Sequence, residues 1–260
     1  MKIIETISEM KIFRKNLSGT VGFVPTMGAL HEGHVSLVQE SILGNSTTIV
    51  SIFVNPTQFN NPDDFKNYPN TLSEDIKVLQ DQGVNVLFLP KYEELYADQY
   101  RFKVSESKLS QILCGKIRPG HFDGVLTVVM KLFNITSPNQ VYFGEKDYQQ
   151  LILIKEMIST FFMDIKLNPV KTKRYENGLA MSSRNSRLTP EQLEKAPLIY
   201  SIMRFEPDIQ IAKTQLKNVG FEVDYLEDVG NRRFIAAYLG KVRLIDNIEK
   251  EFSNKSEVSL

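Results

Sequence analysis

The fold is decided between Thr20 and Val54, where the sequence reads TVGFVPTMGALHEGHVSLVQESILGNSTTIVSIFV. Residues 20–26 are typical of a strand, and residues 47–54 are apolar or β-branched nearly throughout, as a strand buried on both faces should be. Between them, apolar residues recur at helical spacing: Val35, Leu37, Val38 and Ile42. The stretch therefore predicts a strand–helix–strand unit of parallel strands with a right-handed crossover.

Two of the three histidines, His31 and His34, lie where the first strand turns into the helix. A helix N-terminus carries about half a positive charge and several unpaired N–H groups, so it is a natural phosphate site. Two imidazoles there indicate nucleotide chemistry at an α-phosphate. A metal pair is an alternative, but only His121 and Cys114 remain as soft ligands, so zinc would need carboxylates. Two structural histidines are the other alternative.

Strand and helix patterns alternate as far as residue 170. The expected strands are 84–89, 140–143 and 165–170, and the expected helices are 71–82, 124–136 and 147–160. Thr71 and Glu74 have the spacing of a capping box, and Asp147 is expected to cap its helix. The alternation predicts an α/β domain with a Rossmann-like, doubly wound parallel sheet, in which sites lie where the strand order reverses.

The pattern changes after residue 171. Residues 171–187 are typical of a loop, Thr189 and Pro190 open a helix, another helix is expected near 208–218, and three short strands follow at 222–226, 233–239 and 241–246. We expect residues 1–171 to form the Rossmann-like domain and residues 172–260 a smaller α+β domain.

Composition excludes several classes of protein. Lysine plus arginine equals aspartate plus glutamate, at 31 each, so net charge favours neither nucleic acid nor an anionic membrane as the main partner. A single cysteine excludes an internal disulfide framework. We see no signal-peptide core and no apolar stretch near the ~20 residues of a membrane helix, so the expected location is the cytoplasm.

Polar segments follow two more strands. After the strand ending at Val54, Asn55 and Gln58 present amides that suit a small polyhydroxy acid, although turn capping explains them equally well. After residue 143, Gly144 permits close backbone approach and Lys146 supplies a charge, with Gln150 on the first helical turn. An ordinary capped helix with a solvated lysine is the alternative.

Two further segments carry phosphate-binding side chains. In the segment 178–185, Ser182, Ser183 and Arg184 could close over a nucleotide, unless the segment is only a polar linker. A basic loop with Arg118 and His121 is a weaker candidate, because basic surface loops are common. Taken together, the segments predict a triphosphate site in which His31, His34, Lys146 and Arg184 stabilise the charge of a transition state at the α-phosphate.

These segments resemble the pantothenate synthetase (pantoate–β-alanine ligase) family, which belongs to the nucleotidylyltransferase superfamily with a His-x-Gly-His motif. The similar segments are 25–34, 53–59, 118–134, 143–150, 178–185, 223–227 and 243–247. The resemblance implies ATP-dependent condensation of pantoate with β-alanine through pantoyl adenylate, with release of AMP and pyrophosphate. It also implies a C-terminal lid domain, Mg²⁺ as counter-ion of the co-substrate ATP, and a homodimer.

The resemblance assigns roles residue by residue. His34 is the expected proton donor, with His31, Lys146 and Arg184 assisting at the phosphates. Gln58 and Gln150 bind pantoate, Gln58 also faces β-alanine, and Asn55 is the third expected substrate-binding residue. Glu74 and Asp75 are the candidate Mg²⁺ ligands. The implied ATP-binding residues are Met27, Gly28, Ala29, Leu30, His31, Glu32, Gly33, His34, Gly144, Glu145, Lys146, Asp147, Lys173, Met181, Ser182, Ser183 and Arg184.

The chain departs from the family pattern in length. The spacing of the similar segments predicts that about two dozen residues of the family pattern are absent between the Thr189 helix and Phe221, so we expect a shortened lid and doubt its closure. Two rival functions stay open at this point. One is nucleotidyl transfer to a phosphate acceptor, which would favour basic residues at Asn55, Gln58 and Gln150. The other is ATP binding without turnover.

Overall fold

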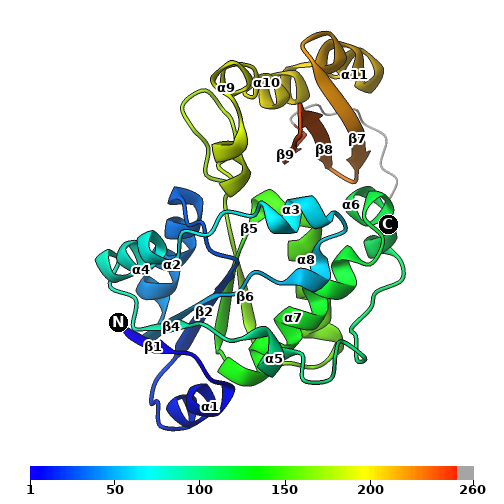
Figure 1. Ribbon diagram of the computed structural model, residues 1–260. Helices are drawn as coiled ribbons and strands as arrows, with labels where there is room; N and C mark the ends of the chain where they lie inside the picture. Colours follow the sequence, from blue (N-terminus) through cyan, green and yellow to red (C-terminus); the bar gives the residue numbers. More distant parts are fainter. Residues whose placement is uncertain (251–260) are drawn as a thin grey trace. The chain divides into compact units, whose positions relative to one another are not determined.

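The structure is a computed structural model that describes residues 1–250 (Figure 1). The chain divides into two compact units. The first comprises residues 1–173 with residues 181–183, and the second comprises residues 174–180 with the chain from Arg184 onward. The division falls two residues after the boundary expected at residue 171, and a three-residue segment returns to the first unit.

The first unit contains a six-stranded, all-parallel sheet. Its strands in chain order are β1 (Lys2–Ile4), β2 (Val21–Thr26), β3 (Thr47–Ile52), β4 (Val86–Phe88), β5 (Gln140–Gly144) and β6 (Lys166–Val170). In space the order is β1-β4-β3-β2-β5-β6. The chain thus builds outward from β2 through β3 and β4, then crosses back to place β5 on the other side of β2, as the doubly wound prediction requires.

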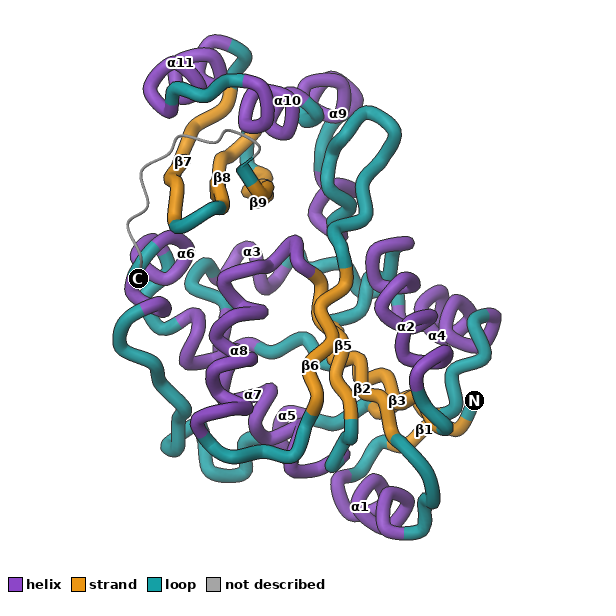
Figure 2. Tube along the Cα trace, turned by 180° about the vertical axis from the view of Figure 1, so that it is seen from behind, coloured by secondary structure: helices purple, strands orange, loops and turns teal. Residues whose placement is uncertain are grey.

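Helices lie on both faces of this sheet, as Figures 1 and 2 show. One face carries α2 and α4, and the other carries α5, α7 and α8. The helices of the first unit are α1 (Ile7–Lys15), α2 (Glu32–Gly44), α3 (Pro62–Lys66), α4 (Leu72–Asp81), α5 (Tyr92–Leu95), α6 (Leu113–Ile117), α7 (His121–Thr136) and α8 (Tyr148–Thr160). Short 3-10 turns precede or connect several of them: η1 (Pro56–Gln58), η2 (Leu109–Gln111) and η3 (Glu145–Asp147).

Neighbouring residues of β2 divide between the two faces. Val24 belongs to a buried cluster with Leu37 of α2 and Leu79 of α4. Phe23 packs edge-to-face on Phe133 of α7, with ring centroids 6.4 Å apart. Because successive strand side chains point to opposite faces, a strand with helices on both faces needs an apolar residue at nearly every position.

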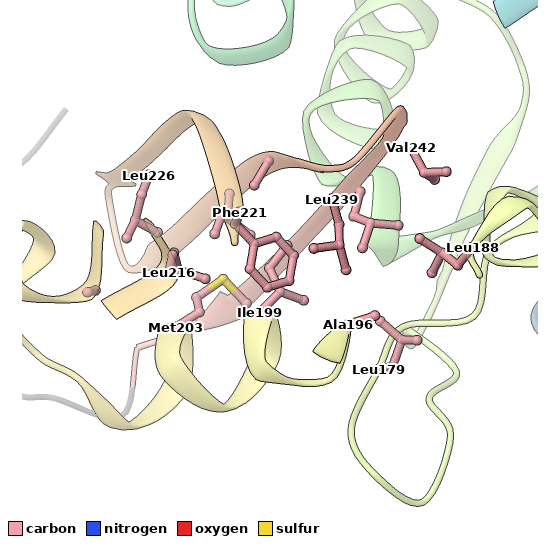
Figure 3. Close-up of a cluster of buried hydrophobic side chains, with 14 residues drawn as sticks. Leu179, Leu188, Ala196, Ile199, Met203, Leu216, Phe221, Leu226, Leu239 and Val242 are labelled. Atoms are coloured by element: carbon pink, nitrogen blue, oxygen red, sulfur yellow. The ribbon is translucent and has the colours of Figure 1, made fainter. Parts of the chain in front are cut away.

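The second unit packs three helices on a three-stranded antiparallel sheet. The helices are α9 (Pro190–Lys195), α10 (Leu198–Phe205) and α11 (Ile209–Asn218), and the strands are β7 (Phe221–Val229), β8 (Arg232–Leu239) and β9 (Val242–Glu249), paired in the order β7-β8-β9. Figure 3 shows its core, where Ile199 and Met203 of α10 meet Phe221 and Leu239 of the sheet. The α+β class expected for this part of the chain is confirmed.

Local sequence signals were less dependable than the strand–helix alternation. Thr71 occupies the N-cap position of α4 but makes no capping hydrogen bond, so the expected capping box with Glu74 is wrong. Asp147 precedes α8 without a side-chain cap. The elements β1, α1 and α10 were not expected from the sequence. No helix among residues 1–250 is long and apolar enough to cross a membrane.

Gly124 of α7 permits the closest approach of a helix to the loop after β3. A Cβ atom there would lie 2.5 Å from the carbonyl oxygen of Thr57 and 2.8 Å from the amide nitrogen of Gln58. Both are backbone atoms, so the loop itself would have to move.

We expect Gly124→Ala to lower the free energy of unfolding by about 1–3 kcal/mol, the usual cost of overpacking, although alanine favours helix more than glycine does. Urea unfolding measures the change. Gly144→Ala is the matched control, because a Cβ at Gly144 meets nothing within 4 Å. A neutral or stabilising effect of Gly124→Ala would contradict the close approach.

Candidate active site

The loop after β2 makes a tight left-handed turn. Gly28 and Ala29 have φ angles of 78° and 52°. The Thr26 hydroxyl accepts a hydrogen bond from the Gly28 amide at 3.2 Å and donates to the carbonyl of Ser51 at 2.8 Å. Left-handed backbone costs a non-glycine residue energy, so Ala29 needs external support.

That support comes from Asp75 of α4, whose side chain is buried. Its two carboxylate oxygens accept hydrogen bonds from the amides of Ala29 at 2.9 Å and Leu30 at 2.8 Å. Thr71 donates to the same carboxylate at 3.2 Å, which explains why it caps nothing. The carboxylate therefore fixes the backbone of the histidine loop.

The expected metal role of Glu74 and Asp75 finds no support in this arrangement. The oxygens of Asp75 already bind backbone amides, and Glu74 is exposed. Among residues 1–250, no group of three or more His, Cys, Asp or Glu side chains could hold a metal ion.

His31 and His34 cap the helix that they begin. The Nδ1 atom of His31 accepts the amide of Gly33 at 3.1 Å, and the Nδ1 atom of His34 accepts the amide of His31 at 3.3 Å. Each neutral ring then carries its proton on Nε2. Two backbone N–H groups at this helix start are thus already bonded to the imidazoles, which keep their Nε2–H groups as donors for a ligand.

Both imidazoles are neutral at neutral pH. Burial, with the positive charge of Lys146 assisting, lowers the pKa of His31 to about 4. Burial also lowers the pKa of His34 to about 3, assisted by His31 and Lys146. The two ring centroids lie 4.1 Å apart. Since Lys146 follows β5 and the histidines follow β2, the pairing of these strands brings the three side chains together.

The loop after β3 carries Gln58 to the same region. Its Nε2 atom lies 3.3 Å from the sulfur of Met27, in the histidine loop, and its Oε1 atom accepts a hydrogen bond from Asn55 at 3.0 Å. Asn55 is buried, and its remaining bonds go to the Gly124 carbonyl, the Thr57 hydroxyl and the Tyr96 hydroxyl. Because these bonds use both ends of its amide, Asn55 is placed to orient Gln58 rather than to meet a substrate.

The two glutamines at the start of α8 differ in their surroundings. Gln149 is buried and bonds to the backbone of Leu109, Ile112 and Cys114, so it anchors the segment before α6. Gln150 is half-buried, and its amide makes no hydrogen bond to other residues in the described range. Gln150 is therefore the one of the pair that fits a ligand-binding role.

The segment 181–183 returns to the first unit. The amide of Met181 donates to the carbonyl of Lys173 at 3.0 Å, and the Ser183 hydroxyl lies 3.3 Å from the Tyr68 hydroxyl. Lys173 stands beside the histidine loop, since a Cβ on Gly33 would lie 3.8 Å from the Lys173 Cβ. Arg184, the next residue, belongs to the second unit.

Arg118 and His121 bind the loop of Gln58 instead of lying on a free basic surface. Both donate to the carbonyl oxygen of Gln58, Arg118 at 3.0 Å and His121 at 2.8 Å. Their three-residue spacing is visible in the sequence, but their partner lies 60 residues away, so no local signal could identify it. The sequence gives no signal for Tyr68 or Tyr96 either, because their partners Ser183 and Asn55 also lie far along the chain.

Comparison with known proteins identifies the family. The family model for pantoate-beta-alanine ligase matches residues 2–249. The chain belongs to the pantoate–β-alanine ligase family. It is therefore an enzyme that joins pantoate to β-alanine.

Relatives named for this activity have nearly the same length as this chain. The chain is 52% identical to a pantothenate synthetase of Bdellovibrio bacteriovorus over 95% of this chain and 99% of that protein, and 48% identical to one of Legionella pneumophila with the same coverage. A pantoate-beta-alanine ligase structure from Francisella tularensis, complexed with beta-gamma ATP and beta-alanine, matches with a TM-score of 0.94 at 45% identity, over 97% of this chain and 99% of that chain.

The short C-terminal domain is shared by these relatives. Each is aligned over 99% of its own length, so none carries an extra segment of two dozen residues that this chain lacks. The length departure noted in the sequence is therefore no loss particular to this chain.

The depressed histidine pKa values predict acid sensitivity. An unfolded histidine binds a proton below about pH 6.5, whereas His31 and His34 stay neutral down to about pH 4 and 3. The unfolded state thus holds more protons in this window, and stability falls as pH decreases, by at most about 1.4 kcal/mol per pH unit for each imidazole. Urea unfolding between pH 7 and 4 measures the slope. His34→Gln should reduce the slope, and an unchanged slope would contradict the neutral buried ring.

Asp75→Asn should destabilise the histidine loop. The new amide NH₂ faces a backbone N–H, leaving a buried donor unpaired at a cost of about 1–3 kcal/mol. Glu74→Gln is the matched control, since that exposed carboxylate should change stability by less than about 0.5 kcal/mol. Chemical unfolding compares the two variants. Equal losses of stability in the two variants would contradict the role of Asp75 in holding the loop. Equal changes in the Mg²⁺ requirement of the two variants would support a metal role for the pair.

Proposed function

We propose that the chain condenses pantoate with β-alanine at the expense of ATP, through a pantoyl adenylate, with release of AMP and pyrophosphate. The observation that carries this proposal is the meeting of two neutral imidazoles and Lys146 beside the switch between β2 and β5, with the amide of Gln58 held next to the same loop. Phosphate chemistry and recognition of a small acid are thus served from adjacent strand ends.

In the first step, a carboxylate oxygen of pantoate attacks the α-phosphorus, and the bond to the bridging oxygen of pyrophosphate breaks. Negative charge spreads over the equatorial oxygens in the transition state. The Nε2–H groups of His31 and His34 donate hydrogen bonds to that charge, and Lys146 adds a full positive charge. Fixed donors of this kind typically contribute ~10²–10³ in rate each.

The proton-donor role of His34 follows from its environment. In the free protein the ring is neutral, because burial and nearby positive groups lower its pKa. A bound triphosphate brings negative charge, which raises the pKa of a neighbouring imidazole. In both its neutral and its protonated form His34 carries a proton on Nε2, so it donates a hydrogen bond from this atom to the α-phosphate oxygens.

In the second step, the β-alanine nitrogen attacks the acyl carbon, the carbon–oxygen bond to AMP breaks so that AMP leaves with the electron pair, and the proton of the amine passes to water. Gln58 and Gln150 hold pantoate, and Gln58 also faces the incoming amine. Holding both reactants in one site replaces a bimolecular encounter, with effective concentrations of roughly 10⁵–10⁸ M in well-oriented cases.

The remaining assignments follow the family pattern. ATP is bound by residues 27–34, 144–147, Lys173 and 181–184. Mg²⁺ enters with ATP and is held mainly by phosphates and water, while the oxygens of Asp75 bind the amides of Ala29 and Leu30. We further propose a homodimer and a cytoplasmic location.

The first test is AMP formation from MgATP, with pantoate and β-alanine each omitted in turn. AMP should appear only with both substrates, and pantoate alone should support pyrophosphate exchange into ATP. Exchange with a phosphorylated acceptor instead would favour nucleotidyl transfer. ATP binding with no turnover under any combination would contradict the ligase function of this chain.

His34→Ala should lower pyrophosphate exchange by ~10²–10³, because one fixed donor to the transition state is lost. Glu40→Ala, an exposed change on the same helix, is the control and should exchange at the normal rate. A near-normal rate of pyrophosphate exchange in His34→Ala would show that His34 is not a donor to the transition state.

A further inference from the structure

The backbone carbonyl of Gln58 accepts two side-chain hydrogen bonds from a distant part of the chain. The Arg118 guanidinium donates to it at 3.0 Å, and the Nδ1 atom of His121 lies 2.8 Å from it. Arg118 follows α6, and His121 is the first residue of α7. Two side chains thus donate hydrogen bonds to one backbone oxygen of a proposed substrate-binding residue.

The bonding pattern fixes the tautomer of His121. A guanidinium only donates, so the His121 Nε2 atom, 3.2 Å from the second terminal nitrogen of Arg118, must accept. The ring proton then lies on Nδ1 and is donated to the Gln58 carbonyl. This is the opposite tautomer from that of His31 and His34, and hydrogen bonds then connect Arg118, His121 and the Gln58 carbonyl to one another.

The side chain of Gln58 is oriented separately. Asn55 donates to its Oε1 atom at 3.0 Å, and Asn55 is itself fixed by the buried Tyr96 hydroxyl and the Gly124 carbonyl. Burial raises the pKa of Tyr96 to about 12, so its hydroxyl stays protonated and donates. Among residues 1–250, the Nε2–H group of Gln58 is left with only the Met27 sulfur, a weak acceptor that a ligand oxygen readily replaces.

We propose that Arg118 and His121 are positioning residues for pantoate recognition, which act by holding the backbone of Gln58 so that its amide N–H meets an oxygen of the acid. The inference rests on the proposed function. The loop needs this support because η1 is a three-residue turn, and a displacement of about 1 Å can cost up to ~10²-fold in rate.

The test is the pantoate dependence of pyrophosphate exchange. Arg118→Ala and His121→Phe should each raise KM for pantoate about tenfold or more while leaving KM for ATP within twofold. His121→Asn should restore much of the loss, because its amide can donate near the position of Nδ1. Lys116→Ala is the matched control: it removes an exposed positive charge two residues from Arg118 and should change neither constant.

A double-variant cycle separates positioning from direct contact. If Arg118 acts through Gln58, adding Arg118→Ala to Gln58→Ala should cause little further loss, because no amide remains to be oriented. Full additivity, or a rise in KM for ATP, would overturn the proposal and make Arg118 a phosphate ligand. An effect of Lys116→Ala equal to that of Arg118→Ala would overturn it in favour of general electrostatic attraction.

A readout without substrate keeps the proposal distinct from the function on which it rests. In the free protein, Arg118→Ala should accelerate amide hydrogen exchange in residues 55–59, whereas Lys116→Ala should not. If the unmodified enzyme shows no pantoate-dependent exchange of pyrophosphate, the proposed function fails. Unchanged hydrogen exchange in Arg118→Ala would overturn the anchoring of the loop, whatever the substrate. If Arg118→Ala does not fold, the comparison of His121→Asn with His121→Phe tests the proposal instead. His121→Phe should then accelerate hydrogen exchange in residues 55–59 more than His121→Asn does.

Discussion

Strand β2 pairs with β3 on one side and with β5 on the other, and the site depends on that double pairing. All three strands run parallel, so the loops that follow them leave the same edge of the sheet. The loop after β2 brings the histidines, the loop after β5 brings Lys146, and the loop after β3 brings Gln58. The strand order therefore brings together residues that lie far apart in the chain.

Given that placement, hydrogen bonds to the backbone decide what each side chain offers. The two site histidines accept amides through Nδ1 and so keep Nε2–H for a ligand, whereas His121 accepts through Nε2 and donates through Nδ1. The same residue type thus serves as ligand donor or loop anchor, according to which ring atom the backbone occupies. A neutral donor suits the site histidines because Lys146 already supplies positive charge, and a second buried charge beside it would be costly.

The sequence predicts the parallel sheet because alternation over many residues averages out local error, and it predicts His31, Lys146 and Gln58 as neighbours because all follow strands. It fails where partners are distant. Thr71 and Glu74 have capping-box spacing, yet Thr71 bonds to Asp75, which the histidine loop recruits instead. Asn55 has the chemistry of a substrate ligand, yet its amide is already hydrogen-bonded to the Tyr96 hydroxyl and the Gly124 carbonyl. Residue type and spacing indicate which chemistry a side chain can perform. Competition among buried polar groups for hydrogen-bond partners then decides which side chains are left to contact the substrate.

This competition separates the residues of the site into two classes. Asn55, Asp75 and Gln149 are buried and bonded to protein groups at both ends, so replacing one would leave a neighbour unpaired. Within the described residues 1–250, His31, His34 and Gln58 each keep one donor without a strong protein acceptor, and the side-chain amide of Gln150 makes no hydrogen bond. A site that must bind first a carboxylate and then an amine benefits from this division, because the rigid class holds geometry while the other class exchanges partners between steps.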